Sequence, residues 1–257
     1  MTAVSASPRR RASPEKARPS AFWPAALLVI PAVGWFARLR VTGAEHLPAD
    51  GPYVLAPNHY SEFDPLILAV GTWRIGRAPR FLAKESLFRV PALGLLLRST
   101  GMVPVPRAST AAGAKQSIAQ AEALVTHGRG VIVYPEGSLT RDPELWPMRG
   151  KTGAVRLALA GDIPVIPVAT WGVQHILPRY GRLRLWPPRK RVEMRLGPPV
   201  DLAQWRGRTT PGNLAAATDA VMAAIADLLG DLRGQTPPTQ RWNPSVHGQN
   251  ETGRLEP

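Results

Sequence analysis

The alternation of short apolar runs with helical patterns, which starts near residue 40, constrains the fold more than any other feature of this sequence. Runs typical of buried strands, bounded by turn residues, occupy residues 53–56, 80–83, 101–105, 130–134, 163–169 and 191–196. Patterns with the helical period occupy residues 65–74, 86–98, 109–126, 150–160 and 213–232. This alternation predicts an α/β fold with helices packed on a sheet. Because several connections are short, we expect one domain with a mixed, mostly parallel sheet flanked by helices.

Two segments of different character precede this domain. Residues 1–20 carry five basic side chains against one acid, with Ser, Pro and Ala between them, which predicts a flexible basic tail. Residues 21–37 contain no charge, and Trp23 and Trp35 lie near the two ends, where a membrane interface favours aromatic side chains. Two prolines interrupt the run, so we interpret it as a membrane-associated helical segment, either embedded or interfacial, rather than a signal peptide. A buried core helix is the alternative.

The domain itself is expected to cover residues 38–234. Its last helix has apolar side chains at three- and four-residue steps, and Gly234 follows as an end signal. Residues 235–257 are polar and contain prolines, which predicts a second flexible tail.

The charge balance points to anionic partners. The formal net charge is +14, which favours lipid headgroups, phosphorylated substrates, an acidic carrier protein or nucleic acid. No recognisable nucleic-acid module is present, so we expect no nucleic-acid partner. The absence of cysteine excludes disulfides and a cysteine nucleophile, and no histidine has ligand partners at metal-site spacing, so we expect no metal.

A histidine and an aspartate stand five residues apart, directly after the strand predicted at 53–56. His59 would lie in the loop at the end of that strand, where ligands bind in α/β sheets. Asp64 precedes Pro65 and a helical run, so we expect it to be the N-cap. A neutral imidazole can accept the proton of a hydroxyl, and a carboxylate on its other ring nitrogen fixes the tautomer. The spacing alone leaves two interpretations open, a catalytic pair and a helix cap beside an unrelated histidine.

Two later segments place glycine and arginine at the ends of predicted strands. In residues 134–141 the glycine permits a tight turn whose backbone N–H groups can bind an anion, with Arg141 and Arg149 nearby. Residues 101–107 end in Arg107, and the planar guanidinium of arginine suits phosphate. A solvated surface charge is the alternative for each arginine.

Together, four segments resemble the glycerolipid acyltransferases, in particular the 1-acyl-glycerol-3-phosphate acyltransferases. The block N-H-x4-D stands at residues 58–64, and the glycine followed by a strand ending in Arg stands at 101–107. The block F-P-E-G-T-R stands as Tyr-Pro-Glu-Gly-Ser at 134–138, and the apolar run around a proline stands at 165–168. The resemblance covers about residues 38–200, and the order and spacing of the four blocks make it specific.

The resemblance implies direct acyl transfer from acyl-CoA or acyl carrier protein, with no cofactor. The acceptor would be the sn-2 hydroxyl of 1-acyl-glycerol 3-phosphate, and the product phosphatidic acid for phospholipid biosynthesis. His59 would be the general base and Asp64 would orient it. The residues implied for acceptor and phosphate binding are Arg107, Glu136, Gly137, Ser138 and Arg141.

The sequence departs from the family pattern at two positions of the third block. Leu139 stands where an Arg usually falls, and Arg141 is expected to supply the missing contact. Ser138 keeps the hydroxyl of the usual Thr. Glu136 is itself anionic, so we expect it to hold an Arg or a glycerol hydroxyl. Lys151 either supports the anion site or is a lysine at a helix start.

The net charge, the apolar segment at 21–37 and the basic tail predict an anionic membrane surface as a partner, and the resemblance implies a membrane lipid acceptor. We expect the protein at the cytoplasmic face of the cell membrane, peripheral or monotopic. One alternative is an acyltransferase for another lysolipid or polyol. A second is a lipid hydrolase using Ser61 or Ser138 with His59, although no G-x-S-x-G elbow is present. A third is a non-catalytic binder of anionic lipid or nucleic acid, which the basic tails allow although no nucleic-acid module is present.

Overall fold

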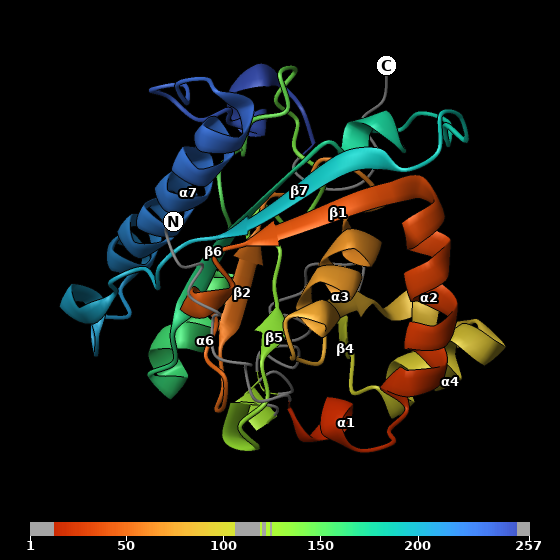
Figure 1. Cartoon of the computed structure of the whole chain (residues 1–257). Coiled ribbons are helices and arrows are strands. Elements are labelled where there is room, and N and C mark those ends of the chain that lie inside the picture. Colours follow the sequence, from red (N-terminus) through yellow and green to blue (C-terminus); the bar gives the residue numbers. More distant parts are fainter. Residues whose placement is uncertain (1–12, 106–118, 120–121, 124, 251–257) are drawn as a thin grey trace, which may run out of the picture.

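A computed structural model describes residues 13–105, 119, 122–123 and 125–250, and its centre is a five-stranded sheet (Figure 1). The strands, in the order β1-β7-β6-β2-β5, are β1 (Ala37–Thr42), β7 (Lys190–Leu196), β6 (Val165–Trp171), β2 (Val54–Pro57) and β5 (Val131–Ile132). Neighbouring strands are parallel except β6 and β7, which are antiparallel. The predicted α/β fold with a mixed, mostly parallel sheet is therefore confirmed.

A second, two-stranded parallel sheet extends the first beyond β5. It consists of β3 (Leu82–Lys84) and β4 (Val103–Val105). A parallel bridge between Phe81 and Ile132 joins the two sheets. The connection between β3 and β4 contains the 3₁₀ turn Glu85–Arg89 and helix α4 (Pro91–Ser99).

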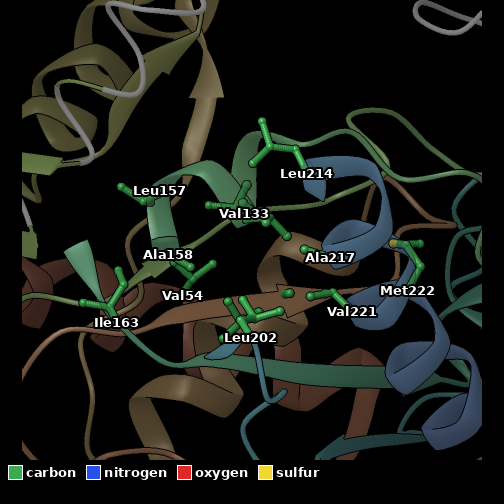
Figure 2. Packing of buried hydrophobic residues seen from close by; sticks show 14 of the residues in the cluster. Val54, Val133, Leu157, Ala158, Ile163, Leu202, Leu214, Ala217, Val221 and Met222 are labelled. Atoms are coloured by element: carbon green, nitrogen blue, oxygen red, sulfur yellow. The ribbon is translucent and has the colours of Figure 1, made fainter. Parts of the chain in front are cut away.

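Helices cover both faces of the main sheet (Figure 1). Helices α6 (Gly153–Gly161) and α7 (Pro211–Arg233) pack on one face, and α3 (Asp64–Arg74) and α2 (Phe22–Phe36) pack on the other. Successive side chains of a strand point to opposite faces. Thus Val54 and Ala56 join the cluster under α6 and α7, which Figure 2 shows, whereas Leu55 packs toward α3. The inner strands β2 and β6 are buried on both faces, which is why they appear as continuous apolar runs in the sequence.

Helix α7 is the one helix among the described residues that is long and apolar enough to cross a membrane. Nine of its residues are buried, and they include Leu214, Val221, Ile225 and Leu229. These side chains pack on the sheet, so α7 is a core helix of the domain. Its start is fixed by the hydroxyl of Thr210, which accepts the N–H of Asn213.

Short elements complete the described chain. Helix α1 covers Pro14–Ala17, and the remaining 3₁₀ turns are Ala44–His46, Val173–His175, Ala203–Trp205 and Pro244–His247. The loop before β7 contains a cis peptide bond between Trp186 and Pro187.

Three observations at the periphery concern the sequence-based expectations. Strand β1 was not predicted, because its alternating residues directly follow an apolar helix. Residues 235–250 make more contacts than their composition predicts, since Arg241 pairs with Asp219 and the carbonyl of Trp242 accepts the N–H of Arg149. Most of the helix expected at 109–126 lies outside the described residues, as does Arg107.

Candidate active site

The carboxyl end of β2 is locked to the neighbouring strand β6 before the chain enters the H-x4-D segment. The side-chain oxygen of Asn58 accepts the backbone N–H of Thr170 at 2.8 Å, and its amide donates to the carbonyl of Thr170 at 3.2 Å. Asn58 is buried, so these bonds satisfy an amide that has lost water. The loop that carries His59 therefore starts from a fixed point.

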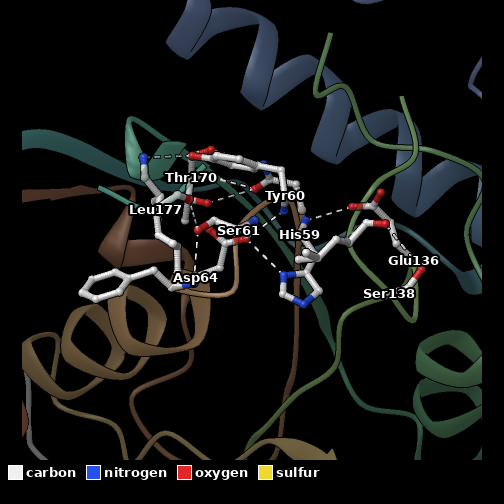
Figure 3. A network of polar contacts seen from close by, with 12 residues as sticks. His59, Tyr60, Ser61, Asp64, Glu136, Ser138, Thr170 and Leu177 are labelled. Atoms are coloured by element: carbon white, nitrogen blue, oxygen red, sulfur yellow. Dashed lines mark hydrogen bonds and ion pairs between the residues drawn. The ribbon is translucent and has the colours of Figure 1, made fainter. Parts of the chain in front are cut away.

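His59 and Asp64 contact one another directly (Figure 3). The imidazole Nδ1 lies 3.0 Å from Asp64 Oδ2. A carboxylate only accepts, so Nδ1 carries the proton and Nε2 is left with its lone pair. The side chain of His59 is 16% exposed, whereas Asp64 is fully buried. The geometry is that of an oriented base with one nitrogen free to accept a proton.

Asp64 was expected to cap helix α3, and that prediction is wrong in detail. The helix begins at Asp64 itself, Phe63 is the N-cap, and no side chain caps the helix. The Asp64 carboxylate instead turns back to the preceding loop, where Oδ2 accepts the N–H groups of Tyr60 and Ser61, each at 2.8 Å. The aspartate thus holds both the loop and the imidazole.

The loop after β5 fixes the backbone of His59 from the other side. Glu136 Oε1 accepts the N–H of His59 at 2.9 Å, and Oε2 accepts the N–H of Met148 at 3.0 Å. The carbonyl of His59 accepts the N–H of Thr140 at 2.7 Å. Glu136 is fully buried, and burial raises its pKa to about 8, although the two N–H donors act in the opposite direction. The expectation that Glu136 would face an arginine or a glycerol hydroxyl differs from this arrangement.

Tyr134 packs against the imidazole of His59. The two ring centroids are 3.9 Å apart with an interplanar angle of 24°. The phenol hydroxyl is buried and has no hydrogen-bond partner among the described residues. The ring therefore limits how far the imidazole can turn, and its hydroxyl takes no part in holding it.

The turn at Gly137 borders a lysine. Gly137 has φ +70°, and a Cβ on it would approach the Lys151 side chain, at 3.0 Å from Cδ and 3.5 Å from Nζ. The backbone N–H of Lys151 also donates to the carbonyl of Pro135 at 2.7 Å. Ser138 is half-buried beside this turn, and Leu139 is buried. Among the described residues, the atoms nearest to a Cβ at this position thus belong to Lys151, and the glycine leaves room for its side chain.

Arg141 lies buried in the loop after the glycine turn. Its side chain is 2% exposed, and Nη1 donates to the hydroxyl of Tyr180 at 2.9 Å. Its expected contact with the acceptor phosphate stays a prediction.

The two serines weighed as nucleophiles are placed differently from a serine-hydrolase nucleophile. Ser61 is fully buried, and its hydroxyl donates to the carbonyl of Leu177 at 2.6 Å. The hydroxyl of Ser138 lies 3.4 Å from the carbonyl of Leu139. In the described part of the chain, no hydrogen bond joins either hydroxyl to His59.

Comparison with known proteins defines the class. The model of the acyltransferase family matches residues 38–171, so this protein belongs to the acyltransferase family. The chain is 29% identical to the 1-acyl-sn-glycerol-3-phosphate acyltransferase of Bacillus subtilis, over 76% of this chain and 89% of that protein. It is 29% identical to 1-acyl-sn-glycerol-3-phosphate acyltransferase alpha of Mus musculus, over 76% of this chain and 65% of that protein.

A solved structure has the same fold. The 1-acyl-sn-glycerophosphate acyltransferase PlsC of Thermotoga maritima superposes with a TM-score of 0.58 and 25% identity, over 80% of this chain and 74% of that one. Coverage of the eukaryotic relatives is partial, because the chain spans 40% of a chloroplastic relative from Brassica napus and 65% of the mouse protein. The resemblance to the glycerolipid acyltransferases found in the sequence is confirmed.

Proposed function

We propose that this protein transfers a fatty acyl group from acyl-CoA or acyl carrier protein to the sn-2 hydroxyl of 1-acyl-glycerol 3-phosphate. The product would be phosphatidic acid, made for phospholipid biosynthesis. The observation that carries the proposal is the contact between His59 Nδ1 and Asp64 Oδ2, which leaves Nε2 ready to accept a proton. The names of the relatives support the choice of acceptor.

The chemical step needs one base and no covalent enzyme intermediate. As the acceptor hydroxyl attacks the thioester carbonyl carbon, Nε2 of His59 takes its proton, and the new C–O bond forms. The C–S bond then breaks, and the departing thiolate recovers the proton from the imidazolium. The carboxylate of Asp64 lies 3.0 Å from Nδ1 and would stabilise the imidazolium while it exists.

The phosphate of the acceptor would lie against the Gly137 turn. Lys151 supports this assignment because its side chain lies over the glycine, where no Cβ keeps a ligand away. Glu136 and Arg141 would act on the shape of the site, since both are buried and bonded within the protein. Arg107, which the family pattern places at this site, remains a predicted contact.

The protein would act at the cytoplasmic face of the cell membrane, where its lipid acceptor is found. The apolar side chains Trp23, Leu27, Leu28 and Trp35 of α2 are exposed. Exposed apolar clusters of this kind favour a membrane interface. At 15 residues, α2 is about 22 Å long, so it is short of the roughly 30 Å hydrocarbon core and suits an interfacial position.

A competition assay tests the acceptor. The full chain is incubated with an acyl-CoA and, together, lysophosphatidic acid, glycerol 3-phosphate and neutral lysolipids, and products are identified by mass spectrometry. We expect phosphatidic acid as the main product, and its loss in His59→Ala. A product formed only from a non-phosphorylated acceptor would overturn the choice of lysophosphatidic acid and favour another lysolipid or polyol.

A second arm separates transfer from hydrolysis. Loss of the thioester is followed with and without acceptor. Transfer predicts that thioester loss depends on the acceptor, and hydrolysis predicts that it does not.

A further inference from the structure

The loop that enters β7 exposes an unusual set of large apolar side chains. Within residues 181–191, which we call the β7 entry loop, Leu183, Leu185 and Trp186 are 45%, 62% and 81% exposed. Every residue from 181 to 187 is exposed. A contiguous exposed apolar group on a soluble surface marks a contact with a partner or a membrane.

Basic residues alternate with these apolar ones. Between residues 176 and 191 the chain has six arginines or lysines and no Asp or Glu, and the sequence from Arg182 to Leu185 reads Arg-Leu-Arg-Leu. This composition complements a surface that is both anionic and apolar. Arginine can bind lipid phosphate while its stem stays on apolar surface, and a tryptophan ring suits the headgroup level. Charge complementarity therefore favours a bilayer over a protein partner.

The loop is held in shape by hydrogen bonds. Nζ of Lys190 donates to the carbonyls of Arg184 and Pro187, at 2.8 and 2.6 Å. The N–H of Arg184 donates to the carbonyl of Ile176 at 2.8 Å. Because the backbone is already fixed, the exposed side chains do not have to be ordered by a ligand.

A hollow of about 590 Å³ opens beside the loop. Its lining combines cations with aromatic rings and includes Trp171, His175, Arg184, Trp186, Lys190 and Arg191. One acid, Glu193, also lines it, and that carboxylate is paired with Arg191 at 2.9 Å and Arg40 at 3.8 Å. The cations that line the hollow could therefore bind an anionic headgroup. The carboxylate of Glu193 would not repel it, because that charge is paired within the protein.

The loop is continuous both with α2 and with the candidate active site. The N–H of Arg189 donates to the carbonyl of Trp35, which is 61% exposed at the end of α2. At the other end, just before the loop, the Leu177 carbonyl accepts the hydroxyl of Ser61, and Arg179 Nη1 donates to the carbonyl of Asp142 at 2.8 Å. A surface seated on the loop would therefore lie close to the His59 segment.

We propose that the β7 entry loop docks on a membrane surface of anionic phospholipid headgroups. Leu183, Leu185 and Trp186 enter the interface, and the loop's basic side chains bind lipid phosphate. The loop is a second membrane contact beside α2 and sets the candidate active site at headgroup level. This inference rests on the membrane-surface part of the proposed function.

A single fluorescent label tests insertion. The chain has no cysteine, so Leu185→Cys can carry one environment-sensitive dye on the full protein. With vesicles of phosphatidylcholine and phosphatidylglycerol, we expect a blue shift and quenching by lipid-borne quenchers. With phosphatidylcholine alone we expect a much smaller change. The matched control is Gln204→Cys, an exposed site in the 3₁₀ turn Ala203–Trp205 between β7 and α7, which should stay in water.

A charge variant tests the electrostatic part. In the triple variant Arg182→Gln, Arg184→Gln, Arg189→Gln, we expect binding to the anionic vesicles to fall about tenfold or more at fixed salt. The matched control removes three exposed arginines outside the loop, Arg129 before β5 and Arg206 and Arg208 between β7 and α7, and should lose less than about threefold, because these side chains do not belong to the docking surface. Arg206 pairs with Asp162 at 2.7 Å, so circular dichroism checks that this variant is folded.

Three results would overturn the proposal. The first is that the dye at position 185 stays in water while the protein is bound to vesicles. The second is that the dye signal changes without any lipid. The third is that the two triple variants lose vesicle binding equally. All readouts measure binding and can be made in the His59→Ala background. Failure of the loop proposal is therefore distinguishable from failure of the proposed acyl transfer.

Discussion

Two loops meet at His59, and each brings a fully buried carboxylate to it. In the loop after β2, Asp64 holds the imidazole through Nδ1 and two neighbouring backbone N–H groups. In the loop after β5, Glu136 holds the backbone N–H of His59 and that of Met148. One carboxylate therefore orients the side chain of the base, and the other fixes the backbone that carries it.

The difference lies in what each carboxylate faces. Asp64 contacts a ring that would become positively charged during the proposed reaction, so its charge would contribute directly to the chemistry. Glu136 contacts uncharged groups, namely two backbone amides and the side chain of Thr140, and burial raises its pKa to about 8. We therefore expect activity to depend on the negative charge of Asp64. For Glu136 we expect it to depend on the two oxygens that accept hydrogen bonds.

The largest effect should follow from Asp64→Asn. The amide can still accept from the loop, but it presents no charge to the imidazolium and can stabilise the wrong tautomer. We expect kcat to fall by about 10³-fold, with KM and the fold little changed. Steady-state kinetics and circular dichroism measure the two. The matched control is Glu62→Gln, an exposed acid in the same loop, and an equal loss there would remove the special role of Asp64.

Glu136→Gln should have the next largest effect. Glutamine has one acceptor oxygen, so one of the two N–H groups would face an NH₂ group, at a cost of about 1–3 kcal/mol in the free energy of unfolding. The backbone N–H of His59 would then be held less firmly, so the imidazole would be positioned less precisely. We therefore expect kcat to fall roughly ten- to hundredfold. Glu144→Gln, an exposed acid in the same loop, should leave both quantities unchanged. Activity equal to that of the wild type would show that the backbone contact is dispensable.

The pH dependence of stability tests whether Glu136 has the raised pKa that distinguishes it from Asp64 in this comparison. The pKa of Glu136 is about 8 in the folded protein against an ordinary 4.5, so between these pH values the folded state holds a proton that the unfolded chain has released. The free energy of unfolding should therefore fall as pH rises from about 4.5 to 8, and this contribution should level off above 8. Urea unfolding at several pH values should show a shallower decline in Glu136→Gln. Parallel curves for the two proteins would contradict the raised pKa.

Lys151→Met should act on binding more than on chemistry. If its ammonium contacts the acceptor phosphate beside Gly137, the KM for a phosphorylated acceptor should rise about tenfold, with kcat less affected. Lys151→Arg should recover part of the loss, and Arg156→Gln, which removes an exposed cation from the adjacent helix, should have no such effect. An unchanged KM in Lys151→Met would move the phosphate away from the glycine turn.

The smallest expected effect is a difference in kcat between two variants of Tyr134. Tyr134→Phe keeps the ring on His59 and removes a buried hydroxyl that has no partner among the described residues, so kcat should hold and stability should rise slightly. Tyr134→Leu loses the stacked ring, worth about 0.5–1.5 kcal/mol, and kcat should fall a few-fold. Kinetics and thermal unfolding of both variants measure this. Equal kcat values would show that the stack does not hold the imidazole.

Much of the architecture could be predicted from the sequence because its signals are local. The buried runs that form β2 and β6 appear as continuous apolar segments, and the apolar face of α7 repeats every three or four residues. Strand β1 escaped prediction because an apolar helix ends directly before it. The pairing of His59 with Asp64 could also be predicted, since a loop of five residues carries both partners.

The remaining contacts at the site are between residues far apart in the chain. Glu136 bonds the N–H of His59 from 77 residues away, and Arg141 donates to Tyr180 from 39 residues away. A backbone N–H is present at nearly every residue, so no sequence pattern says which carboxylate will meet it. The sequence by itself determined the α/β fold, the family and the pairing of His59 with Asp64. Only the tertiary structure decided that Glu136 and Arg141 lie buried within the protein, because burial depends on how remote loops pack together.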